Sequence, residues 1–82
     1  MRLDKYLKVS RIIKRRTVAN EACDAGHVLV GGKPARASYD VKVGDILELT
    51  LGARTIRVEV RSVNEYATKD NAASMYRILE EG

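Results

Sequence analysis

The apolar residues of this chain change their spacing at Gly26, and this change constrains the fold more than any other feature of the sequence. Before Gly26 they recur every three or four residues, as on one face of a helix. Leu3, Tyr6 and Leu7 mark such a face on a short helix expected over residues 2–9. After Gly26 they alternate with polar residues, as in half-buried strands. The sequence therefore predicts an α+β fold, with two short N-terminal helices packed on a small, mostly antiparallel sheet.

The second helix is expected over residues 18–25. Thr17 is a suitable N-cap, Glu21 near the helix start suits the helix dipole, and Gly26 belongs to the residue type that most often ends helices. Small residues form the packing face of this helix. Cys23 lies on that face and is expected in the core, where a free cysteine behaves as a small hydrophobe.

Two hairpins are expected after the helices. Gly31 and Gly32 would form the two-residue turn of the first, and Pro34 marks a strand end or a sheet edge. The second hairpin joins a strand over residues 46–51 to the strand that follows, through a turn at residues 52–53. The residues expected to form the core are Leu3, Leu7, Val18, Ala22, Val28, Val30, Leu47 and Leu49.

From Val63 onward the pattern weakens. The segment is polar and loop-like, with a helical turn expected near residues 71–75. Residues 76–79 fit either a last strand or a continued helix, and the pattern leaves this open. All 82 residues are expected to form one domain, because a chain of this length has a modest core and no room for a second.

Positive charge is concentrated in the first quarter of the chain. The net charge is +4, but residues 1–20 carry seven basic side chains and one acidic one, Asp4, which suits the first turn of a helix. Such an asymmetry is typical of a surface that binds a polyanion. The last basic residues of the series would lie beside the N-terminal amides of the second helix, a good position for phosphate. The candidate binding residues are Arg2, Lys5, Lys8, Arg11, Lys14, Arg15 and Arg16.

Several functions are not expected from this sequence. The single histidine, His27, lacks a partner at a catalytic spacing, and no nucleophile or metal motif occurs, so neither an enzyme nor a metal or other cofactor is expected. One cysteine excludes an intramolecular disulfide. No apolar run approaches the roughly 18–20 residues of a membrane span, and no signal peptide is recognised, which makes the cytoplasm the expected compartment. The four tyrosines are dispersed, so a nucleic acid would be bound through its backbone and shape.

The order of these parts resembles the S-four-type (S4) RNA-binding domain, named for a protein of the small ribosomal subunit. The resemblance rests on RLDKYL, on the basic KRRT that opens a helix, and on DAGHVLVGGKPARASYDVKVGDILEL. Gly31 stands where the family often has Asn, and Val43 where it often has Pro. The match implies that residues 1–51 form the RNA-binding core, while residues 52–82 add a hairpin strand and a C-terminal extension.

Two kinds of small stand-alone members of this family are similar to the chain. One comprises heat-shock RNA-binding proteins of the large ribosomal subunit. The other acts in bacterial ribosome-associated quality control, and MRLDKYLKVSRIIKRRT and AASMYRIL carry that resemblance over nearly the whole chain. It implies a protein that binds large-subunit rRNA and peptidyl-tRNA, and that stabilises the tRNA while RqcH adds alanine to stalled nascent chains. The resemblance also implies that the RNA contacts come from the seven basic residues named above, chiefly Arg2 and Arg16. A monomer is expected because nothing in the sequence demands a dimer.

Three other interpretations are left open by the sequence. A general heat-shock-type factor would bind large subunits or structured RNA without RqcH. A regulatory binder of DNA or messenger RNA is disfavoured, because residues 18–25 offer few side chains that read bases. An accessory subunit of an RNA-modifying enzyme would copurify with a catalytic partner.

Overall fold

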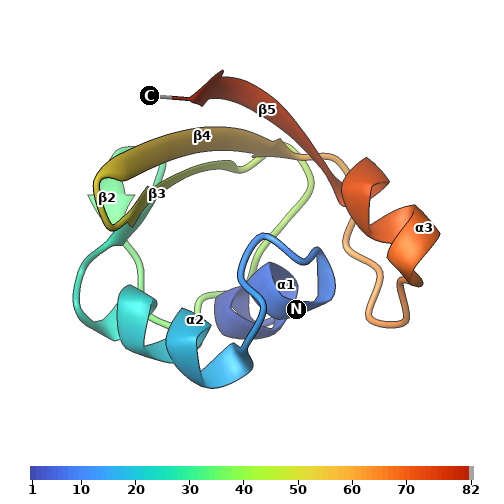
Figure 1. Ribbon diagram of the computed structural model, residues 1–82, viewed down its shortest axis with the longest axis horizontal. Coiled ribbons are helices and arrows are strands. Elements are labelled where there is room, and N and C mark those ends of the chain that lie inside the picture. The colour runs from blue at the N-terminus through green and yellow to red at the C-terminus, as the bar shows by residue number, and fades with distance from the viewer. Residues whose placement is uncertain (82) are drawn as a thin grey trace.

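The computed structural model describes residues 1–81, in which two helices cover one face of a five-stranded sheet (Figure 1). The sheet has the order β2-β1-β3-β4-β5, and every neighbouring pair of strands is antiparallel. The predicted α+β fold is therefore confirmed. The elements, in chain order, are α1 (Leu3–Val9), α2 (Arg16–Asp24), β1 (Val28–Val30), β2 (Lys33–Pro34), β3 (Ile46–Leu51), β4 (Arg54–Val60), α3 (Lys69–Ala72), the 3₁₀ turn η1 (Ala73–Met75) and β5 (Tyr76–Glu81).

Both predicted hairpins are present in the sheet. Gly31 and Gly32 have φ angles of 60° and 85°, which a two-residue hairpin turn requires and which glycine adopts without a steric penalty. Pro34 lies in β2, an edge strand, where a missing N–H removes no bond from the sheet interior. In the second hairpin Leu47 of β3 stands opposite Val58 of β4, so the apolar residues of both strands share the face towards the helices.

The helix α2 begins two residues earlier than the sequence predicts. Its N-cap is Arg15, in an extended conformation at φ −122°, and not Thr17. The Arg15 carbonyl accepts a hydrogen bond from the N–H of Ala19 at 3.0 Å, which starts the helical ladder. The first turn then contains no acidic residue, so the expected placement of Glu21 near the helix start is wrong. Gly26 follows the helix at φ 82° and ends it as predicted.

The core lies between the two helices and the sheet. Ala22 and Val30 are only partly buried against it. The prediction for Val18 is wrong, because Ala19 and Cys23 form the inward face of α2 and the Val18 side chain lies beside that face, 46% exposed. The other predicted core residues are buried as expected: Leu3, Leu7, Val28, Leu47 and Leu49.

The C-terminal segment adds to the same sheet and the same core. Residues 76–79 belong to a strand, which decides between the two alternatives that the sequence left open. This strand, β5, pairs with β4 around a bulge. The buried Tyr6 of α1 donates its O–H to the carbonyl oxygen of Met75 at 2.7 Å, which ties the first helix to the segment before β5. Met75, Val58 and Val60 are also buried in this core.

Candidate nucleic-acid interface

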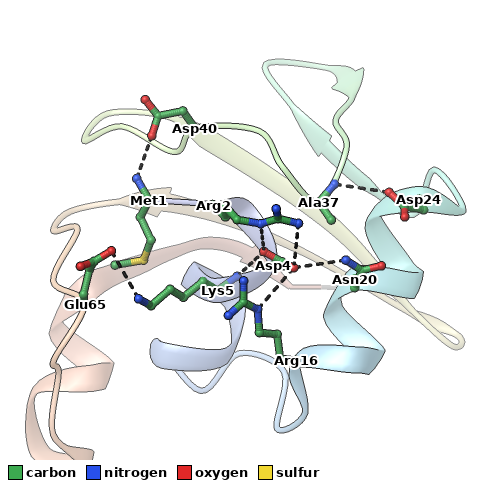
Figure 2. A network of polar contacts seen from close by, with 10 residues as sticks. All are labelled: Met1, Arg2, Asp4, Lys5, Arg16, Asn20, Asp24, Ala37, Asp40 and Glu65. Atoms are coloured by element: carbon green, nitrogen blue, oxygen red, sulfur yellow. Dashed lines mark hydrogen bonds and ion pairs between the residues drawn. The ribbon is translucent and has the colours of Figure 1, made fainter.

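Asp4, in the first turn of α1, lies at the centre of the polar contacts between the two helices, and its side chain is 3% exposed. Its carboxylate accepts hydrogen bonds from Arg2 Nε at 3.1 Å, Arg16 Nε at 3.4 Å and Asn20 Nδ2 at 3.2 Å (Figure 2). Two arginines from the starts of different helices therefore converge on one buried carboxylate. Both arginine side chains stay about half exposed, at 51% for Arg2 and 49% for Arg16, and keep surface for a ligand.

The pKa of the Asp4 carboxyl lies below its ordinary value in spite of its surroundings. Burial raises this pKa, but hydrogen bonds from Arg2, Asn20 and the backbone N–H of Lys5, together with the charge of Arg16, lower it by more. The carboxylate is consequently ionised at neutral pH, and it holds both arginines as an ion pair as well as through hydrogen bonds.

From the sequence, Arg2 and Arg16 are the chief RNA-binding candidates. For Asp4 the sequence predicts only a favourable interaction with the helix dipole, and for Asn20 it predicts no role. The hydrogen bonds from Arg16 and Asn20 to Asp4 depend on how α1 packs against α2, and no local sequence pattern predicts this packing. One signal was present: Arg16 and Asn20 are four residues apart and therefore share one face of a helix. An arginine and an amide on one face, with RLD upstream, indicate a shared carboxylate partner.

A second group of basic residues lies where α1 ends and the chain turns towards α2. Lys8, Arg11 and Lys14 line one depression there. Arg11 follows Ser10, the C-cap of α1, and has a φ of 64°, a left-handed conformation that is uncommon outside glycine. This reversal of the chain gathers three positive charges at the C-terminal end of α1, which the helix dipole favours.

The two remaining candidates are placed differently. The ammonium group of Lys5 forms an ion pair with Glu65, with Nζ and Oε1 3.3 Å apart, so its charge is partly offset (Figure 2). Arg15 is exposed at the N-cap of α2. All seven candidates lie in α1, at its N-cap, in α2 or in the connection between the two helices. We call them together the basic two-helix surface: Arg2, Lys5, Lys8, Arg11, Lys14, Arg15 and Arg16.

Other reactive groups form no comparable cluster in the part of the chain that the structure describes. Cys23 is buried, and burial, followed by the charges of Asp4 and Asp24, raises the pKa of its thiol to about 11. Within residues 1–81 no group of three or more His, Cys, Asp or Glu side chains could hold a metal ion. Among the same residues no helix has the length and apolar character to span a membrane.

A small antiparallel sheet that supports a basic pair of helices defines a class of modules suited to phosphate-rich polymers. A family model described as the S4 domain matches residues 1–47. The chain belongs to this family, as the resemblance in its sequence indicated.

Curated relatives match nearly the whole chain. The RQC P-site tRNA stabilizing factor of Bacillus subtilis is 49% identical over 99% of this chain and 94% of its own length. The protein of the same name from Streptococcus pneumoniae is 51% identical over 99% of this chain and 92% of its own length. Among solved structures, a trimeric structure of Vibrio cholerae heat shock protein 15 has a TM-score of 0.88 and 26% identity, covering 95% of this chain and 80% of that one. Both resemblances seen in the sequence are thereby confirmed.

Proposed function

We propose that this chain binds the large ribosomal subunit and stabilises peptidyl-tRNA in the P site during ribosome-associated quality control. The observation that carries the proposal is the full-length similarity to relatives whose name states P-site tRNA stabilisation. In this proposal RqcH is the partner that extends the stalled nascent chain with alanine. The protein itself acts in the cytoplasm, as a monomer, by binding and not by catalysis, and without a cofactor.

The basic two-helix surface performs the binding. Arg2 and Arg16 are held by Asp4 and keep exposed guanidinium surface, which suits the planar, two-pronged recognition of a phosphate. The depression lined by basic residues at the end of α1 supplies a second group of charges on the same rigid unit. Two such groups can hold an rRNA backbone and a tRNA backbone in a fixed relation, and this lowers the free energy of one tRNA position relative to the others.

Binding of this kind depends steeply on salt. Each phosphate contact adds about −0.7 to −0.9 to the slope of log affinity against log salt concentration, because bound counterions are released. If five or six of the basic side chains take part, affinity falls roughly 10²–10⁴-fold between low and moderate salt.

The proposal is tested by expressing the tagged protein in a Gram-positive host and separating lysates on sucrose gradients before and after translation is stalled. Arg16→Ala removes one charge from the basic two-helix surface. Arg77→Ala is the matched control: it removes the same charge from β5, where Arg77 stands opposite Glu59 on the sheet face away from the helices.

We expect the wild type and Arg77→Ala to comigrate with large subunits that carry peptidyl-tRNA, and we expect Arg16→Ala to be lost from them. Absence of the wild type from every ribosomal fraction would contradict ribosome binding altogether. Retention of Arg16→Ala at the wild-type level would contradict the assignment of Arg16.

A second candidate function is a heat-shock-type factor that binds large subunits whether or not tRNA is present. It is supported by the likeness to heat shock protein 15 over 95% of this chain. The same gradients separate the two functions, because this factor would migrate with free large subunits before translation is stalled.

A further inference from the structure

Asp4 is a carboxylate placed among the residues that are proposed to bind phosphate. It is nearly inaccessible to solvent, and it pairs with both Arg2 and Arg16 (Figure 2). A negative charge at this position offsets one of the two positive charges and repels phosphate. If total positive charge alone determined binding, the surface would bind RNA more strongly without Asp4.

The carboxylate of Asp4 also fixes the positions of the Arg2 and Arg16 side chains. Its Oδ1 accepts from Arg2 Nε and from the backbone N–H of Lys5, at 3.1 and 2.8 Å, while its Oδ2 accepts from Arg16 and Asn20. Each oxygen therefore has at least two donors, and the carboxylate itself cannot rotate. Arginine has a long side chain with many rotamers, and fixing it before a ligand arrives removes an entropic cost of binding.

We propose that Asp4 is a positioning residue that makes the basic two-helix surface selective for folded RNA over flexible phosphate chains. It holds Arg2 and Arg16 in one arrangement that matches a fixed pair of phosphates. At the same time it weakens the general attraction to any polyanion. This inference rests on the proposed function, in which folded RNA is the ligand.

The chain offers a matched control for this role. Glu21 lines the same depression as Asp4 and Arg16, but its carboxylate is exposed and forms none of the hydrogen bonds that hold the arginines. Asp4→Asn and Glu21→Gln remove the same charge from the same neighbourhood. Only the first removes the carboxylate that positions Arg2 and Arg16.

Affinities are measured for two ligands: large ribosomal subunits carrying peptidyl-tRNA in the P site, and poly(U) as a flexible chain. We expect Glu21→Gln to bind both ligands more tightly, by a similar factor. We expect Asp4→Asn to bind poly(U) more tightly but to bind the loaded subunits about tenfold more weakly, since preorganisation is lost. If Asp4→Asn raises or lowers both affinities together, Asp4 does not set selectivity and the proposal is overturned.

A second variant keeps the test valid if Asp4→Asn does not fold. Asn20→Ala removes one of the donors that fix the carboxylate and leaves the net charge unchanged. We expect about threefold weaker binding to the loaded subunits, with no change for poly(U). Unchanged affinity for both ligands would overturn the proposal.

Arginine side-chain NMR on the free protein separates this inference from the proposed function. In the wild type and in Glu21→Gln we expect the Nε–H groups of Arg2 and Arg16 to exchange slowly with water, and in Asp4→Asn we expect fast exchange. Wild-type arginines that exchange as fast as the exposed Arg77 would overturn the positioning role. Slow exchange in a protein that fails to bind ribosomes would contradict the proposed function and leave the positioning role of Asp4 intact.

Discussion

Arg11 is the one residue other than glycine that has a positive φ among residues 1–81, and it lies in the basic two-helix surface. A left-handed conformation costs a residue with a Cβ about 1–2 kcal/mol, and glycine avoids that cost. The arginine at this position therefore has a strained backbone while its charge adds to the basic two-helix surface.

Two substitutions of Arg11 separate the cost of its backbone conformation from the contribution of its charge to RNA binding. Arg11→Gly and Arg11→Ala both remove the guanidinium group, but only glycine relaxes the backbone. We expect Arg11→Gly to be more stable than Arg11→Ala by about 1 kcal/mol in urea denaturation, with the same loss of RNA affinity in both. Equal stability of the two variants would show that the backbone is not strained at this position.

The ion pairs of Asp4 stabilise the folded protein at neutral pH, and this stabilisation is lost at acid pH. Its pKa is lower in the folded protein than in the unfolded chain, so the unfolded state binds the proton more readily. This contribution is complete above the ordinary pKa of 3.8 and is lost as the pH falls through the folded value.

We therefore expect the free energy of unfolding to fall more for the wild type than for Asp4→Asn between about pH 6 and about pH 2. Asp40 also has a lowered pKa, through its hydrogen bond to the N-terminal ammonium group, but it is present in both proteins and cancels in the comparison. Urea denaturation at the two pH values measures the difference. Parallel losses in the two proteins would show that Asp4 carries no such stabilisation.

The candidate binding residues that the sequence proposes are identified by their charge alone. The basic series is visible because its members are close together in the chain. Asp4 and Asn20 are missed because they meet only after α1 and α2 pack, across a separation of 16 residues. The same limit explains the error at Val18, since the face of α2 that turns inward is decided by its packing against α1 and β1.

At the scale of elements, the strands with a buried face are predicted well and the last strand is not. In β3 and β4 the buried residues alternate with more accessible ones, and this period is readable in the sequence. β5 is an edge strand whose residues are mostly exposed, so it has no such period. Its conformation is determined by pairing with β4, which is a tertiary contact.

The contact between α1 and the turn before β5 also belongs to this scale. Tyr6→Phe removes the buried hydrogen bond to the Met75 carbonyl, and we expect the free energy of unfolding to fall by about 1 kcal/mol. Tyr66→Phe is the control, because that side chain is 86% exposed and its loss of the hydroxyl should change stability little. Thermal or urea unfolding measures both. Equal effects of the two substitutions would mean that the Tyr6 hydrogen bond does not stabilise the contact.

The two faces of the molecule differ in charge: one carries an excess of positive charge, and on the other positive and negative side chains are paired. The helices carry the basic two-helix surface on one side of the sheet, as Figure 1 shows for the elements. On β3, β4 and β5 the charges are balanced, because Arg57 pairs with Glu48 at 3.2 Å and with Glu80 at 3.6 Å. One face of the protein is thus suited to phosphate, while the paired charges on the other face attract it much less.

The core is likewise a property of the whole molecule, although the family match ends at residue 47. Val58, Val60 and Met75 are buried against the helices and β3, and they come from the segment after residue 51. Burial of a side chain of this size contributes about 1.5–3 kcal/mol, so the three together match or exceed the roughly 5 kcal/mol that holds a small domain folded.

We therefore expect residues 1–51, expressed alone, to lack a cooperative unfolding transition, whereas the full chain unfolds in a single step. Circular dichroism during heating measures this, with the full chain as the control. In the fragment Leu47 would lose its cross-strand partner Val58, and Tyr6 would lose the Met75 carbonyl that accepts its hydroxyl. A sharp transition in the fragment would instead mean that the two helices and the first three strands fold alone, and that the C-terminal segment only adds to a finished core.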